Sequence, residues 1–396
     1  MKKLCAACLA VTSLLLFSGC ATTEKKPAVV LTGNILVDGP NAIANGPKRD
    51  KVLWEYRTAA ACMRAGRYPE AKQYLDDALL ALGGIYGKDK DASKARGYFH
   101  EESKKTFIGE PYERVMAYYY RGILYWMDGE PDNARACFRS GQIEDSSSEG
   151  EQYNADYVLL DYLDGLASVK LGGDGSDAFK RALAEDKKFG KPPAYDAEAN
   201  VLFFVEFSPG PRKYAAGEYR EELHFSIARP PVHSAVVSVD GRTLRAHPYD
   251  DLWFQATTRG GRVMDHVLAN KAVFKKSTDI AGDVGIIGGA TTAMASRNQT
   301  GQEVGLGLLA AGIITKVVSS AATPAADTRA WDNLPRYLSF AALKLSPGPH
   351  VATIEFQAEG GAPLPNLTKT ITINVPADKH DKVVFVSDAS ITPQTL

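Results

Sequence analysis

"MAYYYRGILYWMDGEPDNARACFRSG", residues 116–141, carries small and apolar residues at helical spacing on both sides of a central glycine. Apolar residues three and four positions apart share one face of a helix, and glycine ends helices because it adopts positive φ at little cost. The stretch therefore predicts two helices joined by a tight turn at Gly129. The segment "LWEYRTAAACMRAGRYPEAKQYLDDALLAL", residues 53–82, repeats the pattern around Gly66.

The two segments align position by position. The aligned pairs are Ala59 with Gly122, Cys62 with Tyr125, Gly66 with Gly129, Ala71 with Ala134 and Leu75 with Phe138. These offsets resemble the tetratricopeptide repeat, a helix-turn-helix of about 34 residues with small, aromatic, glycine, alanine and phenylalanine positions. A third, degenerate copy is predicted from Tyr153 to Asp186. The resemblance implies stacked helical hairpins, whose concave face usually binds a peptide or a neighbouring protein segment.

Aromatic side chains are dense in the copy at residues 116–141. The five rings are those of Tyr118, Tyr119, Tyr120, Tyr125 and Trp126. All of them except Tyr125 are the candidate partner-binding residues. Two interpretations are open. In the first, three of these five rings belong to the core and the others pack against the insertion at residues 83–115. In the second, they line a groove for a partner peptide or a glycan strand, since such rings supply large contact area with a polar handle.

From Asn200 onward the sequence changes to short β-rich runs bounded by proline and glycine. The runs are "NVLFFVEF", "ELHFSIAR", "HSAVVSVDGRTLRA", "RYLSFAALKL", "HVATIEFQ", "LTKTITINV" and "KVVFVS". Asp240-Gly241 between two alternating runs is a strong hairpin signal. About seven short strands with turn signals predict a β-sandwich-like domain.

Residues 259–335 interrupt these strands, and residues 282–318 within them are rich in glycine and alanine. The longest uncharged apolar run there, Val304 to Thr315, has 12 residues, against the roughly 18 or more that a membrane-spanning helix needs. Small residues recur at four-residue spacing, which permits close helix crossing. We therefore expect a tightly packed α-hairpin with "SRNQTGQE" as its turn.

The end of the interruption, "AADTRAWDNLPRY", contains a candidate structural motif. Asp327 is expected to cap a short turn that Pro335 ends, and Arg329 to pair with Asp332. Trp331 is expected to fill the place where the interruption rejoins the sandwich. A ligand site in this segment is the alternative.

The amino terminus has the pattern of a bacterial export signal, with Lys2 and Lys3 before a largely apolar run. Its end, Phe17-Ser18-Gly19-Cys20, resembles the lipobox of bacterial lipoproteins. That resemblance implies removal of residues 1–19 and a diacylglycerol on Cys20, and the Ala21 that follows favours the outer membrane, facing the periplasm. An ordinary secretory signal or an uncleaved anchor is the alternative. Residues 20–50 are rich in turn formers and predict a flexible tether.

The charge balance argues against nucleic acid as a partner, and the sequence contains no recognised catalytic motif. Loss of residues 1–19 removes two lysines, so 44 basic residues face 47 acidic ones, too even a balance for nucleic-acid binding. There is no His-Glu-x-x-His or Gly-x-Ser-x-Gly motif, and the seven histidines lack metal-ligand spacing. We expect no cofactor and no enzyme, with a hydrolase built from scattered residues as the alternative. Cys62 and Cys137 are either buried thiols or a disulfide.

The chain as a whole resembles an uncharacterised family of bacterial outer-envelope lipoproteins with a tetratricopeptide-like amino-terminal half. The matching features are "FSGC", "EPYERVMAYYYRGILYW", "ADTRAWDNLPRYLSFAALKL" and "SPGPHVATIEF". The expected fold class is α+β, with a helical domain at 51–195 and a sandwich-like domain at 196–396. The expected function is a lipid-anchored adaptor that binds an envelope protein or cell-wall glycan. A self-assembling or membrane-active protein that uses residues 282–318 is the alternative, and the oligomeric state stays open.

Overall fold

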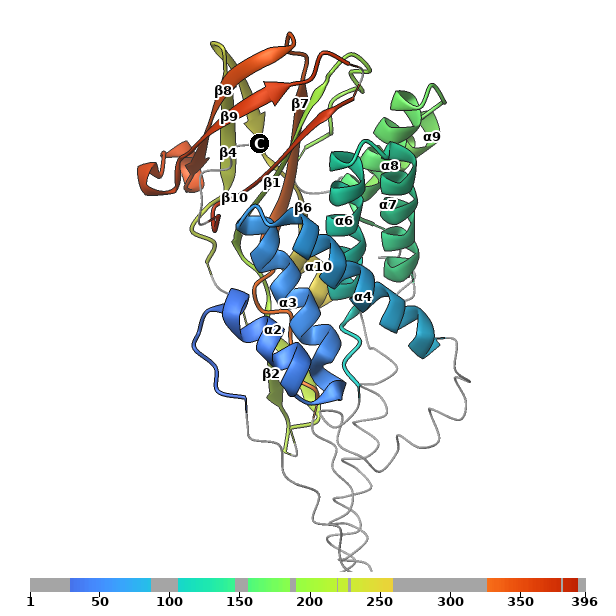
Figure 1. Cartoon of the computed structure of the whole chain (residues 1–396), viewed down its shortest axis with the longest axis vertical. Helices are drawn as coiled ribbons and strands as arrows, with labels where there is room; N and C mark the ends of the chain where they lie inside the picture. The colour runs from blue at the N-terminus through green and yellow to red at the C-terminus, as the bar shows by residue number, and fades with distance from the viewer. Residues whose placement is uncertain are drawn as a thin grey trace, which may run out of the picture.

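Helices fill the amino-terminal half of the chain and sheets follow in the carboxyl-terminal part, so the fold is α+β (Figure 1). The computed structural model describes residues 29–86, 106–146, 156–185, 190–218, 220–226, 229–258, 326–378 and 380–390. The predicted signal peptide, Cys20 and the predicted α-hairpin at 282–318 lie outside the described residues.

Three pairs of consecutive helices form hairpins. They are α3 (Lys51–Arg64) with α4 (Tyr68–Tyr86), α6 (Pro111–Met127) with α7 (Pro131–Ser146), and α8 (Val158–Lys170) with α9 (Ser176–Glu185). The turns contain Gly66, Gly129 and Gly172, whose φ angles are 69°, 80° and 78°. The predicted glycine turns are therefore confirmed, because these positive φ values are ones that side-chain-bearing residues rarely adopt.

The small residues of the first helices allow close helix contact. A Cβ atom added to Gly122 would lie 2.5 Å from the ring of Phe138 on α7. A Cβ added to Gly165 of α8 would collide with the hydroxyl of Tyr195, and Ala59 of α3 is fully buried. At Gly122 the small residue thus allows close contact with the paired helix α7, whereas at Gly165 it makes room for Tyr195, which lies beyond α9.

Two four-stranded sheets and one ribbon make up the β part. The first sheet has the order β10 (Lys382–Ser387), β1 (Val201–Pro209), β7 (Pro335–Leu343), β6 (Pro248–Asp251), and only the β1–β10 pair is parallel. The second sheet is antiparallel, in the order β5 (Arg242–Ala246), β4 (Ser234–Val239), β8 (Gly348–Gln357), β9 (Lys369–Val375). The ribbon pairs β2 (Arg212–Ala216) with β3 (Glu222–Ser226). Every predicted run forms a strand, and the hairpin at Asp240-Gly241 is confirmed.

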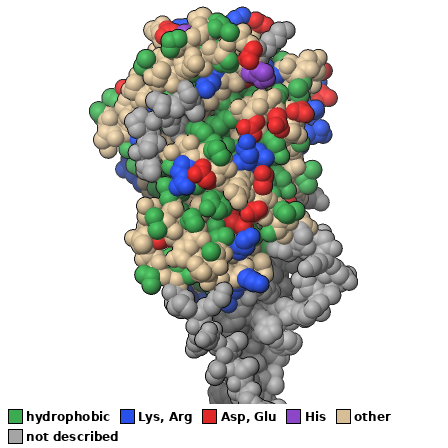
Figure 2. Space-filling view, in the orientation of Figure 1, with side chains coloured by type: hydrophobic (Ala, Val, Ile, Leu, Met, Phe, Trp, Pro, Cys, Tyr) green, Lys and Arg blue, Asp and Glu red, His purple; other side chains and the backbone are tan. Residues whose placement is uncertain are grey.

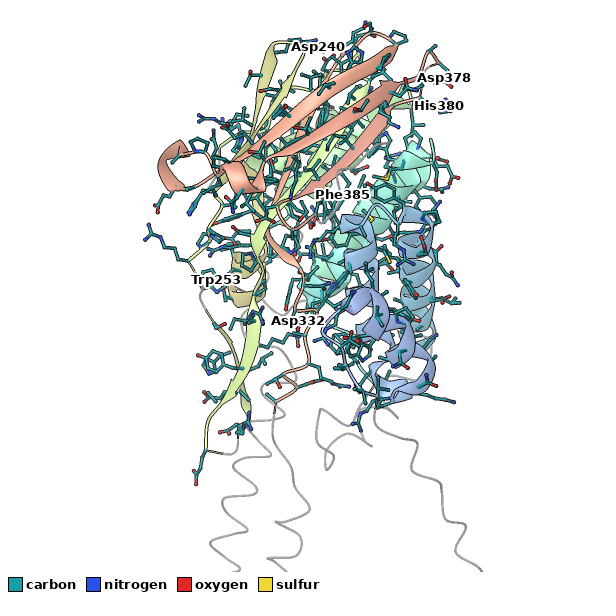
Figure 3. The ribbon with its side chains drawn as sticks, turned by 60° about the vertical axis from the view of Figure 1, so that its left-hand side comes forward. Asp240, Trp253, Asp332, Asp378, His380 and Phe385 are labelled. Carbon is teal, nitrogen blue, oxygen red and sulfur yellow. The ribbon has the colours of Figure 1, made fainter. Side chains whose placement is uncertain are left out.

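The first sheet lies between the helices and the second sheet (Figures 1 and 3). Alternate residues of a strand point to opposite faces. On β1, Phe203 and Phe207 join the core shared with the second sheet, whereas Leu202 and Phe204 join the core shared with the helices. A strand buried on both faces is continuously apolar, which explains the run "VLFFVEF".

The helices cross the first sheet in the order of its strands. Tyr120 of α6 packs edge-on against Phe385 of β10, and Tyr162 of α8 lies beside Phe340 of β7. One hydrophobic core therefore continues across the predicted domain boundary at 195/196. The change from helix to strand falls at this boundary, but the two parts share their interior.

Part of the predicted flexible tether is ordered, so that prediction is wrong for residues 29–50. Helix α2 (Ile35–Asn45) begins at Asn34, whose side chain accepts from the Leu36 N–H at 3.1 Å. A Cβ at Gly39 would collide with the Thr58 hydroxyl, so α2 meets α3 in close contact there. Gly39 and Pro40 indicate a turn in the sequence, whereas in the structure the glycine is the contact point of a helix containing an internal proline.

Replacement by alanine should change the stability of the fold in opposite directions at Gly122, which is crowded, and at Gly83, which is not. Gly122→Ala should lower the free energy of unfolding by about 1–3 kcal/mol, because the new methyl group meets the Phe138 ring. Gly83→Ala on α4 has nothing within 4 Å and should raise stability by up to about 1 kcal/mol through helix propensity. Urea unfolding followed by circular dichroism measures both, and equal effects would contradict the close-contact role of Gly122.

Candidate functional site

The aromatic candidates on α6 lie mostly in the interior. Tyr119, Tyr120 and Trp126 are at most 1% exposed. Tyr119 and Trp126 both contact the ring of Phe204 on β1, each with centroids 6.3 Å apart. Tyr118 and Tyr125 are partly exposed. Tyr118 faces α7, where Gly141 approaches its Cβ, and the guanidinium of Arg121 lies over the Tyr125 ring, 3.5 Å from its centroid.

The interpretation that Tyr119, Tyr120 and Trp126 line an open groove for a partner is therefore wrong, because the three rings are buried. The inner face of the three hairpins, formed by α3, α6 and α8, is covered by the first sheet (Figure 3). Phe385, labelled in Figure 3, belongs to β10 and lies 6.0 Å from the ring of Tyr120. The protein's own sheet occupies the face on which a partner segment was expected.

A buried carboxylate on β1 joins the sheet to two helices. Two guanidinium nitrogens of Arg64 on α3 lie 2.7 Å from Glu206 Oε1, and Nε donates a hydrogen bond to that oxygen. Tyr120 donates its hydroxyl to Glu206 Oε2 at 2.5 Å. Burial and the nearby Glu206 carboxylate raise the pKa of Tyr120, so the phenol keeps the proton that it donates. Arg64 also donates to the Asn333 carbonyl at 2.6 Å, which adds the segment before β7 to the cluster.

A second buried ion pair lies at the amino-terminal end of α6. Lys213 Nζ of β2 is 2.8 Å from Glu113 Oε2, and the two side chains are 1% and 0% exposed. Glu113 Oε1 accepts the Trp331 N–H at 2.6 Å and Oε2 accepts the Glu110 N–H at 2.6 Å. Lys213 also donates to the Arg329 carbonyl at 3.1 Å. The pair is thus hydrogen-bonded on both sides, as buried charges require.

The predicted motif at residues 327–335 is present with different partners. Asp327 accepts from the Arg329 N–H at 3.0 Å, which makes the expected turn. Arg329 pairs with Asp327 and with Asp50, both at 2.6 Å, while Asp332 pairs with Arg57 at 2.9 Å. The predicted Arg329–Asp332 pair is therefore wrong: the guanidinium turns toward the start of α3, where a second carboxylate stands.

Trp331 and Pro335 complete this segment. Trp331 stacks on Tyr56 of α3, with ring centroids 4.4 Å apart and planes 13° apart. It lies just before β7, where the interruption rejoins the strands, and it fills the core between the helices and the first sheet. Pro335 follows the turn and starts β7, as its missing N–H allows at a strand beginning.

Adjacent acids on β6 serve two different helices. Asp250 accepts the N–H groups of Val158 and Leu159 at 3.0 and 2.9 Å, and so caps α8. Asp251 accepts the N–H of Trp253 at 3.0 Å at the start of α10 (Leu252–Thr258). Burial raises the pKa of Asp250 to about 7, although the two backbone N–H groups oppose this shift.

Sequence reasoning missed Glu206, Lys213 and Asp250 as members of these clusters. Glu206 carried a signal, because it is the only charged residue in the strand run at 201–207 and a buried charge needs a partner. Lys213 and Asp250 stand in unremarkable polar stretches. Their partners are distant in sequence, so no local pattern marks them.

Cys62 and Cys137 are free and buried thiols, and the disulfide alternative is not formed. Burial raises the pKa of each to about 11, which keeps them protonated and poorly nucleophilic. Across the described ranges, no group of three or more His, Cys, Asp or Glu residues could hold a metal ion. Nor does any helix in the described part of the chain have the length and apolar character to cross a membrane.

Removing the buried cation should cost far more than removing an exposed one. Lys213→Met leaves Glu113 charged and buried, and should destabilise the fold by about 3–5 kcal/mol. The matched control is Lys344→Met, because Lys344 pairs with Glu198 in an ion pair whose side chains are 59% and 75% exposed. That change should leave the free energy of unfolding nearly unchanged, because an exposed ion pair stabilises a fold little. Chemical denaturation at pH 7 measures both, and equal losses would contradict a structural role for Lys213.

Asp250 predicts a pH dependence of stability. Its pKa is about 7 in the folded state against 3.8 for the ordinary side chain. The folded protein therefore holds this proton more tightly, so its stabilising contribution is complete below pH 3.8 and is lost as pH rises through 7. Asp250→Asn should flatten the fall in unfolding free energy between pH 4.5 and 8, as measured by urea titrations.

The control for this pH dependence is Asp177→Asn, at a side chain that is 86% exposed. It should leave the pH profile of stability unchanged. Glu55, Asp161 and Asp388, whose pKa values burial also raises, give the variant a residual slope of the same sign. An Asp250→Asn profile as steep as that of the wild type would contradict the assignment.

Comparisons with known proteins leave the chain without a relative on which to base its function. A scan against protein-family models, a search of curated proteins and a search of solved structures each found no match. Function therefore has to be inferred from the arrangement of the described residues: an inner helical face closed by the sheet, buried ion pairs at the junction, and an outer helical layer.

Proposed function

We propose that this protein is a lipid-anchored adaptor of the bacterial cell envelope that holds an envelope protein or a cell-wall component and performs no catalysis. Within this proposal the three hairpins are tetratricopeptide-like repeats and the two packed sheets are a β-sandwich. Cys20 carries the lipid, and the chain faces the periplasm from the outer membrane. The lipobox-like Phe17-Ser18-Gly19-Cys20 supports the anchor.

The observation that carries the proposal is the direct attachment of α2 to the first hairpin. Eight residues, 21–28, separate Cys20 from the first described residue, Val29. An extended chain gains roughly 3.3–3.6 Å per residue, so Val29 stays within about 30 Å of the anchor. Helix α2 then packs on α3 at Gly39 and Thr58. The repeats are thus held near the membrane, which suits a scaffold.

The partner surface in this proposal is the outer layer of helices. Because the first sheet covers α3, α6 and α8, the helices α4 and α7 are left facing outward (Figure 1). Leu80 of α4 is 78% exposed and Ile143 of α7 is 68% exposed. We call the exposed residues of α4 and α7, represented by these two, the outer helical face.

The charge pattern favours a protein or uncharged glycan over a polyanion. Figure 2 shows basic and acidic side chains close together on the visible face, without one extended patch of a single sign. Ion pairs also join α4 to the α6–α7 hairpin, namely Lys72 with Asp128 and Arg121 with Asp76. Such alternation gives specificity for a partner with a complementary pattern.

Partner capture with outer-face variants tests the adaptor. The bait is the mature chain with Cys20→Ser, incubated with envelope extract. The wild-type surface should retain a partner that Leu80→Lys and Ile143→Lys each reduce about tenfold, since an anchor residue commonly contributes over 1 kcal/mol. Val351→Lys on β8 is the control, because Val351 is 55% exposed and lies on the second sheet.

Three outcomes would contradict the adaptor. Identical capture by wild type and outer-face variants would remove the outer helical face as the binding surface. Membrane-retained oligomers of the Cys20→Ser chain would favour the self-assembling alternative at residues 282–318. Absence of labelled fatty acid on Cys20, after growth with labelled palmitate, would remove the anchor itself.

A further inference from the structure

Three large aliphatic side chains are exposed at the beginning of the described chain. Val30 is 80% exposed, and Leu31 and Val37 are each 54% exposed. The N–H groups of Thr32 and Gly33 donate to the Asp38 carboxylate, both at 2.8 Å. These bonds fold the segment before α2 back onto its first turns, so the aliphatic residues are presented by an ordered structure. We call Val30, Leu31 and Val37 the amino-terminal face.

Basic side chains follow the same helix. Lys48, Arg49 and Lys51 are all exposed. The two acids between residues 29 and 51 are little exposed: Asp38 is 3% exposed and holds Thr32 and Gly33, and Asp50 pairs with Arg329 at 2.6 Å and with Arg49 at 3.7 Å. Lys51 pairs with the buried Glu55 at 3.0 Å, and its own side chain is 47% exposed. The solvent-facing charge of this segment is therefore positive. Figure 1 shows α2 in the lower part of the described molecule, and Figure 2 shows Lys and Arg side chains at the lower end of the described surface.

We propose that the amino-terminal face docks on the surface of the bilayer that carries the anchor. Val30, Leu31 and Val37 enter the headgroup region, and Lys48, Arg49 and Lys51 meet anionic phospholipid headgroups. The inference rests on the proposed lipid at Cys20, because the eight residues 21–28 keep Val29 within about 30 Å of that lipid.

Because the tether keeps the amino-terminal face close to the bilayer, a small contact area is sufficient for docking. Three aliphatic side chains and three basic ones bind membranes only weakly on their own. Once the lipid is inserted, contact of the amino-terminal face with the same bilayer is intramolecular. Its effective concentration is then on the order of 1 mM for a short linker. Docking then fixes which side of the body faces the membrane and leaves the outer helical face for a partner.

Site-specific fluorescence on the lipidated full-length mature protein tests the docking. Val37→Cys is labelled with an environment-sensitive fluorophore and reconstituted in vesicles of phosphatidylethanolamine and phosphatidylglycerol. Labelling is selective because Cys62 and Cys137 are buried. We expect blue-shifted emission and quenching by spin-labelled lipids. Leu80→Cys on the outer helical face, 78% exposed, is the matched control and should show neither effect.

Charge reversal tests the headgroup contact. Lys48→Glu and Arg49→Glu combined should abolish the blue shift of the label at position 37, as should phosphatidylcholine vesicles at high salt. Lys51 is left unchanged because it pairs with the buried Glu55. Equal emission and quenching at positions 37 and 80 would overturn the proposal, and so would a blue shift unchanged by charge reversal. Failure of the whole protein to stay with vesicles would instead indicate that the anchor is missing, so the two failures are distinguishable.

Discussion

Strand β1 is buried on both faces, and the other layers of the molecule are arranged around it. Phe203 and Phe207 on one face and Phe204 on the other are all fully buried. Neither the helices nor the second sheet can leave without exposing large aromatic rings of the same strand to water. The helical half and the β half are thus coupled through a single strand, even though each contains its own pattern in the sequence.

Buried charges then fix how the layers are aligned. Glu206 lies on the helix-facing side of β1, where Arg64 and Tyr120 reach its two oxygens. A one-residue slip of β1 would move Glu206 to the face that meets the second sheet, where the core consists of aliphatic and aromatic side chains. The unpaired charge would be costly there. Lys213 and Glu113 restrict the β2–β3 ribbon against α6 in the same way.

Local features of the fold were predictable from the sequence, and contacts between distant segments were not. The helices around Gly129, the glycine turns and the strand runs follow from periodicity and from the freedom of glycine at positive φ. That Tyr119, Tyr120 and Trp126 contact Phe204 and Phe385 depends on how the sheet is placed. Periodicity marks the apolar face of a helix, but it does not identify what covers that face.

Helix α2 shows a different reason for failure. Gly39 and Pro40 lie inside α2, and both residue types are typical of loops. The helix propensities of these residues therefore oppose a helix at this place in the sequence. The structure stabilises the helix through tertiary contacts: the Asn34 cap, the Asp38 bonds and the close approach of Gly39 to Thr58. Once α2 is packed, a residue that appears to break the helix is the one that lets it touch α3.

The ends of several described segments meet at one end of the molecule. The Phe107 N–H donates to the Arg49 carbonyl at 2.8 Å, and the Ala326 N–H donates to the Arg220 carbonyl at 2.7 Å. Arg329 links this place to Asp50, at the start of α3. Under the proposed anchoring, this is also the end nearest the membrane. The body of the molecule then presents its outer helices sideways to the periplasm, and a partner held there would lie at a set height above the bilayer. Because the inner face of the hairpins is already filled, such a partner has to recognise α4 and α7 rather than the concave surface that stacked repeats usually offer.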